Sequence, residues 1–165
     1  MCEFNSINAK LGKFAIRGEE DHENFNKVFN NSNFKILENT IEKIYLGSSS
    51  IDLLAVNEKY NKEDIKGYNE EVFTISLSHK PDLTDRVLND LNISLIFAGH
   101  SHNGQIVLPL IGPVFKKEGA KKYPSSHYTI KNTELYVSGC IGNSGHQWRL
   151  FNHPSINFYR LRTNK

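Results

Sequence analysis

The chain has 165 residues, 38% of them hydrophobic and 23% charged, which suits one soluble globular domain over residues 1–165 with its own buried core. The formal net charge is only +2, and the sequence has no basic stripe of the kind that binds nucleic acid. No apolar run reaches the ~18–20 residues of a membrane span. The two cysteines, Cys2 and Cys140, form no C-x-x-C pair, which argues against a disulfide framework. The sequence as written therefore predicts a cytoplasmic protein.

Short apolar runs separated by turn residues predict strands in the first third of the chain. These strands are expected at residues 14–17, 34–37, 41–46 and 51–56. After the first strand, an acidic cluster with Asp21 as a candidate cap precedes apolar residues at helical spacing, which predicts a helix. A hairpin-like break is expected at residues 47–50, and the polar residues 57–69 predict a surface loop with some helix.

A strand–helix–strand unit is predicted next. Residues 72–77 form the first strand, and residues 93–98 form the second. The helix between them has apolar positions Val87, Leu88 and Leu91, with Asp82 or Thr84 as its cap. Beyond this unit the chain is expected to be rich in strands. The later candidate strands are residues 106–108, 126–130, 135–137 and 156–161.

Histidines follow both strands of this unit. His79 lies in S-H-K-P-D at residues 78–82, and His100 and His102 lie in G-H-S-H-N-G-Q at residues 99–105. Because parallel strands end at the same edge of a sheet, we expect the three histidines to converge there. A single histidine at such a place is often only a polar cap of the sheet, but this cluster favours a metal site. In an extended turn, His100 and His102 point to opposite sides and suit two adjacent ions, as in phosphoester hydrolysis.

These motifs resemble the calcineurin-like metallophosphoesterases, in particular a bacterial branch of YkuE- and YaeI-like phosphoesterases. That family has a G-N-H-D/E motif, an isolated histidine and then G-H-x-H, commonly G-H-T-H-G-G-Q. Here the corresponding positions are residues 18–21 (G-E-E-D), His79 and residues 99–105. The closing segment, from L-Y-V-S-G at residues 135–139 to R-L-F-N-H-P at residues 149–154, is also similar.

The resemblance implies a fold and a set of site residues. The fold is an α/β two-sheet sandwich flanked by helices, and the divalent cations are Mn, Fe or Zn. His79 and His100 would bind one ion, together with Glu19 at the place of the family's metal-binding Asn, and His102 would bind another. Glu20 occupies the position of the family's proton-donating His. Asn143 and Arg149 are predicted to lie at the substrate edge, and the substrate class is a phosphomonoester or phosphodiester.

The family's D-x-H and G-D motifs do not occur in the sequence. We therefore expect the C-terminal portion of the fold, without its N-terminal strands and with only part of the dinuclear site, which leaves one bound ion as an alternative to two. Glu19 and Glu20 have the alternative interpretation of helix N-terminal acids, and His22 is an alternative to Glu20. A partner chain or self-association is expected to complete the sheet. The competing hypotheses are a catalytically silent metal-binding or interaction protein and a gene fragment without function. Relatives can be membrane-associated or exported.

Overall fold

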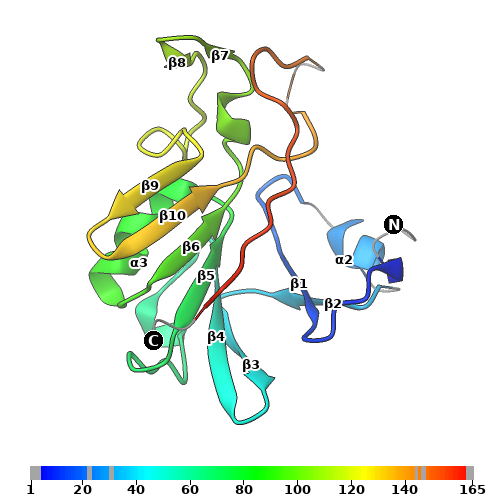
Figure 1. Cartoon of the computed structure of the whole chain (residues 1–165), viewed down its shortest axis with the longest axis vertical. Coiled ribbons are helices and arrows are strands. Elements are labelled where there is room, and N and C mark those ends of the chain that lie inside the picture. The colour runs from blue at the N-terminus through cyan, green and yellow to red at the C-terminus, as the bar shows by residue number, and fades with distance from the viewer. Residues whose placement is uncertain (1–4, 22–23, 30–31, 144, 146–147, 163–165) are drawn as a thin grey trace.

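A computed structural model describes residues 5–21, 24–29, 32–143, 145 and 148–162. Its centre is a six-stranded mixed sheet with the strand order β3-β4-β5-β6-β10-β9 (Figure 1). The sheet's strands are β3 (Thr40–Leu46), β4 (Ser49–Val56), β5 (Thr74–Ser78), β6 (Leu95–Ala98), β9 (His127–Ile130) and β10 (Thr133–Val137). The four central strands are mutually parallel, and the two edge strands β3 and β9 run antiparallel to their neighbours. The carboxyl ends of β4, β5, β6 and β10 therefore meet at one edge.

Smaller elements surround this sheet. The parallel strands β1 (Lys13–Ile16) and β2 (Phe34–Leu37) form a separate pair, and β7 (Val107–Leu108) and β8 (Gly112–Pro113) form a short hairpin. The helices are α2 (Asn24–Phe29) and α3 (Thr84–Asp90), together with the 3-10 turns η1 (Lys62–Asp64), η2 (Pro81–Leu83) and η3 (His102–Gly104).

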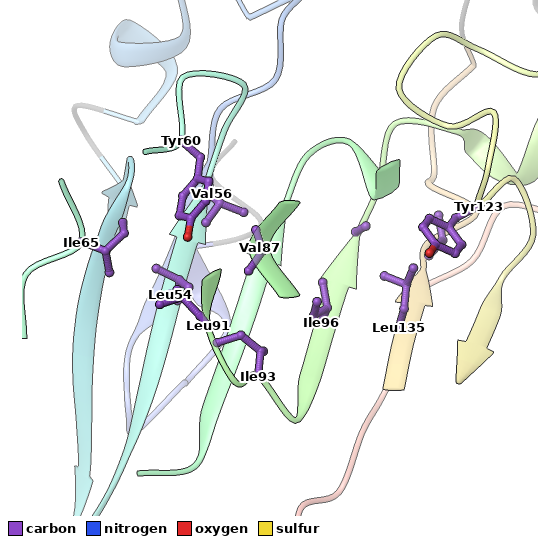
Figure 2. Close-up of a cluster of buried hydrophobic side chains, with 12 residues drawn as sticks. Leu54, Val56, Tyr60, Ile65, Val87, Leu91, Ile93, Ile96, Tyr123 and Leu135 are labelled. Carbon is purple, nitrogen blue, oxygen red and sulfur yellow. The ribbon is translucent and has the colours of Figure 1, made fainter. Parts of the chain in front are cut away.

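The six-stranded sheet is covered on both faces. On one face, Leu54, Val56, Ile96 and Leu135 pack against Val87 of α3 and against the segment that follows β4 (Figure 2). On the other face, Leu53, Ile75 and Leu95 belong to a second cluster with Leu37 of β2, against which Phe14 and Ile16 of β1 pack. Helix α2 lies beside the β1–β2 pair on the side away from the six-stranded sheet (Figure 1). The mixed α/β class is confirmed, and the arrangement is compatible with a metallophosphoesterase-type fold.

Most predicted strands in the first half of the chain are confirmed within one or two residues, and so are the helix α3 and its parallel flanking strands. Three expectations differ from the structure in detail. The segment 57–69 is a mostly exposed loop with the 3-10 turn η1, as predicted, but its Tyr60 (0% exposed) and Ile65 (8% exposed) are buried in the core. The predicted strand at residues 156–161 has no regular secondary structure. Its Tyr159 packs its ring on Phe97 and Tyr136 instead of joining a strand ladder.

The third difference concerns the cap of α3. Neither Asp82 nor Thr84 caps this helix: the residue before it is Leu83, which makes no side-chain cap hydrogen bond, and Thr84 lies in its first turn. Asp82 belongs to η2 and binds a different segment, as described below. None of the helices in the described part of the chain is both long enough and apolar enough to span a bilayer.

The core predicts that two leucines contribute very differently to the free energy of unfolding. Leu54 is 0% exposed and Leu46 is 71% exposed. Leu54→Ala should lower the free energy of unfolding by about 2–5 kcal/mol, because it leaves a cavity between the sheet and α3. Leu46→Ala should change it by no more than about 0.5 kcal/mol. Urea unfolding followed by circular dichroism measures both values, and equal losses would contradict this description of the core.

Candidate metal centre

Three potential metal ligands meet at the carboxyl edge of the sheet. His79 follows β5 directly, His100 is the second residue after β6, and Glu19 follows the end of β1 by three residues. A hydrogen bond joins the two strand ends: the Gly99 amide donates to the His79 carbonyl oxygen at 3.2 Å. The strand–helix–strand unit therefore brings together two histidines that stand 21 positions apart in the sequence.

The three side chains converge on one point. Nε2 of His79 lies 2.8 Å from Oε2 of Glu19 and 3.1 Å from Nδ1 of His100. Nδ1 of His100 lies 3.0 Å from Oε1 of Glu19. Ligand atoms that bind one cation at about 2.0–2.2 Å are themselves about 3 Å apart, which matches this spacing. In the described part of the chain, no other group of three such side chains comes equally close.

The hydrogen bonds of His100 identify which ring nitrogen has the lone pair. Its Nε2 lies 2.7 Å from the carbonyl oxygen of Glu118, which can only accept, so Nε2 carries the hydrogen. In the neutral ring, Nδ1 then directs its lone pair toward the Glu19 carboxylate, an acceptor facing an acceptor. A cation between them removes this repulsion. A backbone carbonyl behind a ligating imidazole is the usual arrangement in metal sites.

The electrostatics of the cluster favour the cation-binding states of His79 and Glu19. Burial lowers the pKa of His79, against the opposing effect of the Glu19 carboxylate, so the ring is neutral at pH 7. Burial by itself raises the pKa of Glu19, but its backbone N–H and the electrostatic effect of the neighbouring His100, His79 and Lys80 side chains together lower it. Lys80 adds a nearby positive charge, with its Nζ at 3.8 Å from Oε2 of Glu19 and in an ion pair with Glu58.

The histidine turn has an unusual backbone. His100, His102, Asn103 and Gln105 all have positive φ values, between 50° and 62°. Non-glycine residues adopt this region at a cost, and such strain persists only where the surroundings fix it. Here Ser101 helps to fix it, because its buried hydroxyl accepts from the Asn103 amide at 3.0 Å. The turn directs His100 and His102 to different partners.

His102 lies apart from the Glu19–His79–His100 cluster. Its Nδ1 is 3.0 Å from the carbonyl oxygen of Gly142, so Nδ1 carries the hydrogen and Nε2 has the lone pair. Burial lowers the pKa of His102, and the positive charges of Lys117 and Arg149 lower it further, while the Gly142 hydrogen bond opposes this change. The expected convergence of three histidines therefore holds for His79 and His100 only, and His102 faces a neighbouring part of the edge.

Arg149 and Asn143 lie next to His102. The Arg149 guanidinium donates to Oδ1 of Asn143 at 2.9 Å and to the carbonyl oxygens of Gly139, Cys140 and Gly142. These bonds use four of the five N–H groups of an arginine. Nη2 also lies 3.3 Å from Nδ1 of His102. The charge of Arg149 is thus fixed beside His102, and most of its donors are used within the protein.

A cavity of about 240 Å³ opens beside the cluster, and Gly18, Glu19, His79 and Lys80 contribute to its walls. Glu20 is exposed on the loop after β1, and His22 lies outside the described residues. Oδ2 of Asp21 accepts from the Gly18 amide at 2.9 Å, and Glu19 faces the two histidines.

Sequence reasoning missed three contributors to the cluster. Lys80 pairs with Glu19, the Glu118 carbonyl orients His100, and Gly18 provides space for His79. Lys80 and Gly18 had local signals, because Lys80 is adjacent to His79 and Gly18 opens the G-E-E-D motif at residues 18–21. The Glu118 carbonyl belongs to a loop with no pattern that points to the site.

Two imidazoles and one carboxylate, with space beside them, form a donor set that catalytic zinc and related transition-metal sites use. The fold and this cluster therefore define an α/β protein with a candidate metal centre at the carboxyl edge of its sheet. No protein-family model matches the chain, and no solved structure matches it.

Curated proteins do match. The chain is 27% identical over 169 aligned positions to the uncharacterized metallophosphoesterase YkuE of Bacillus subtilis (strain 168), with 95% of this chain and 58% of YkuE covered. It is 29% identical to the phosphodiesterase YaeI of Escherichia coli (strain K12), with 52% of this chain and 31% of YaeI covered. It is also 29% identical to the uncharacterized protein YpbG of Bacillus subtilis (strain 168), with 68% of this chain and 40% of YpbG covered.

The similarity to the metallophosphoesterase YkuE and the phosphodiesterase YaeI supports a metallophosphoesterase-like family for this chain. It spans less than two thirds of the length of each of these relatives. Divalent metals are the cofactors that this family implies, and Glu19, His79 and His100 form a ligand triad that fits one ion.

Gly18 gives a sharp test of the cluster. A Cβ atom at this position would lie 2.7 Å from Cε1 of His79 and 2.9 Å from both ring nitrogens, so the ring would have to move. Gly18→Ala should therefore weaken Zn²⁺ binding about 10-fold or more, measured by titration calorimetry. Gly142→Ala is the matched control, because a Cβ there meets nothing within 4 Å. Equal affinity of the two variants would contradict the proposed position of His79.

Proposed function

We propose that this chain carries part of the active site of a metal-dependent phosphoesterase that hydrolyses a phosphomonoester or phosphodiester. The observation that carries the proposal is the convergence of Glu19, His79 and His100 within 3.1 Å of one another at the edge of the sheet. The similarity to YkuE and YaeI supports the same chemistry. Mn, Fe and Zn are the proposed ions, since a mixed imidazole and carboxylate set suits them.

The proposed roles follow from the contacts of each side chain. Glu19, His79 and His100 would hold the ion, which when bound supplies Lewis-acid chemistry at a phosphoryl group. Glu19 supplies negative charge, while the two imidazoles are neutral ligands. Lys80 limits the negative charge at Glu19 and so leaves the edge attractive to an anionic substrate.

Other residues would act next to this ion. We propose His102 as a ligand of a second ion, since its Nε2 has the lone pair. Asn143 and Arg149 are proposed at the substrate edge, where the guanidinium would balance phosphate charge with its remaining donor. Glu20 is proposed as the proton donor to the leaving oxygen, and its exposed position after Glu19 gives it access to a bound ester. Together these residues would form part of a dinuclear site.

One observation favours a second candidate function, that of a catalytically silent metal-binding protein. In the described residues, the cluster of three ligands is compact, but His102 lies apart from it, with Arg149 at 3.3 Å. A chain with only this triad would bind one ion without the second ion that assists the displacement. Turnover distinguishes the two functions.

Partner contact is also part of the proposal. Several large apolar side chains are exposed on the segment after residue 150, including Phe151, Ile156 and Phe158. A partner chain or a second copy that covers them would remove apolar surface from water and complete the fold. Light scattering coupled to size exclusion measures this association, and a monomer at all concentrations would contradict self-association.

Activity is the direct test of the proposed function. With added Mn²⁺, the purified chain should hydrolyse bis(p-nitrophenyl) phosphate, and a chelator should abolish the turnover. His79→Ala and His100→Ala should each lower the rate at least about 100-fold, because each removes a ligand of the ion. Release of p-nitrophenol gives the rate.

His127→Ala is the matched control, since this exposed histidine lies on β9 and pairs with Glu134 away from the cluster. It should retain the full rate. Bound metal without any turnover would favour the silent protein over the enzyme. Turnover that persists in both cluster variants would contradict the proposed site.

Glu20 separates catalysis from metal binding. Glu20→Gln should lower the turnover of an ester with a poor leaving group about 10- to 100-fold, because protonation of the leaving oxygen is lost. The affinity for Mn²⁺ should not change, since Glu20 is not one of the three converging ligands. Rate assays and calorimetry on the same preparation measure both quantities. An unchanged rate would exclude Glu20 as the proton donor.

A further inference from the structure

We propose that Asp82 is a positioning residue of the metal centre, which fixes the orientation of His100 through the segment at residues 118–123. Asp82 does not touch any of the three converging ligands. Its effect would pass through the Glu118 carbonyl oxygen, which accepts from Nε2 of His100 at 2.7 Å. The functional part of this inference depends on the proposed metal site, whereas the structural part does not.

The Asp82 carboxylate accepts hydrogen bonds from three consecutive backbone amides of that segment. Oδ2 accepts from the Lys121 amide at 2.8 Å, and Oδ1 accepts from the Lys122 and Tyr123 amides at 3.1 and 3.2 Å. The Asp82 amide also donates to the Gly119 carbonyl oxygen at 2.9 Å. One residue thus makes four hydrogen bonds to a segment about 40 positions away in the sequence.

These bonds hold the segment against the histidine edge. Gly119 packs on the Lys80 side chain so closely that a Cβ atom there would lie 2.4 Å from its Cδ. Ala120 is fully buried, and its amide donates to the Lys117 carbonyl oxygen at 3.0 Å. The Glu118 carbonyl is therefore fixed between two anchored neighbours, and it points at His100.

Both oxygens of the Asp82 carboxylate are engaged by this segment: all of their hydrogen bonds in the described part of the chain come from the amides of residues 121–123. A carboxylate that accepts several amide hydrogen bonds holds a loop more strongly than a neutral acceptor does. The turn at residues 78–82 then contributes twice to the site: His79 is a proposed ligand, and Asp82 supports the other histidine.

Loss of this support has a chemical consequence. If the Glu118 carbonyl moves, Nε2–H of His100 loses its acceptor, and the proton is free to reside on Nδ1 beside the Glu19 carboxylate. That tautomer removes the lone pair that faces the other two ligands. Outer hydrogen bonds of this type typically contribute about 10- to 100-fold to metal affinity.

The experiment compares Asp82→Ala and Asp82→Asn with Asp85→Ala. Asp85 binds the side chains of Lys122 and Tyr123, but the described contacts of its carboxylate include none of the segment's backbone amides. Two-dimensional ¹⁵N NMR of histidine-labelled protein without metal reads the His100 tautomer, which His100→Gln assigns. Calorimetry with Zn²⁺ gives affinity, and circular dichroism verifies folding. Asp82→Asn keeps one acceptor oxygen. If the alanine variant does not fold, the tautomer and the Zn²⁺ affinity are measured on Asp82→Asn instead.

We expect wild type and Asp85→Ala to hold His100 as the Nε2–H tautomer and to bind Zn²⁺ within about 2-fold of each other. Asp82→Ala should populate the Nδ1–H tautomer and bind Zn²⁺ about 10- to 100-fold more weakly than wild type. Asp82→Asn should have a tautomer population and an affinity between those of wild type and Asp82→Ala. An unchanged His100 tautomer in folded Asp82 variants would overturn the proposal. A wild type that binds no Zn²⁺, but whose tautomer still depends on Asp82, would support the positioning role and overturn the metal function.

Discussion

The whole site depends on one constraint, which is that parallel strands β5 and β6 end at the same edge, side by side and in register. The pair Ser78 and Ala98 closes that register, and His79 and His100 follow it directly. Their nitrogens lie 3.1 Å apart with the Glu19 carboxylate against both. In the tautomers that leave Nε2 of His79 and Nδ1 of His100 without hydrogen, three lone-pair donors face one point, and a cation there would turn their mutual repulsion into binding.

The surrounding residues follow from the need to hold this arrangement. Gly18 leaves space for the His79 ring, and the Glu118 carbonyl oxygen selects the tautomer of His100. The positive φ values of the histidine turn direct His102 to Gly142, away from its neighbour. The edge is therefore divided in two. One part is a compact triad, and the other is a histidine held beside the fixed charge of Arg149.

Much of this could be predicted from sequence because the signals were local. Apolar runs bounded by turns indicated β5 and β6, and their order along the chain implied that His79 and His100 would meet. The burial of Tyr60, the irregular tail around Tyr159 and the role of Asp82 could not be predicted, because each depends on contacts with distant segments. The residue type and position of Asp82 are typical of a helix cap. Only the tertiary structure shows that its carboxylate faces the amides of residues 121–123.

The central claim is that Glu19, His79 and His100 bind one divalent ion. Anomalous diffraction from crystals grown with Mn²⁺ tests it most directly, since the signal locates the metal without reference to activity. The account predicts one strong peak at about 2.0–2.3 Å from a Glu19 carboxylate oxygen, Nε2 of His79 and Nδ1 of His100. A well-ordered cluster without a peak, or a peak whose ligands exclude these atoms, would contradict it.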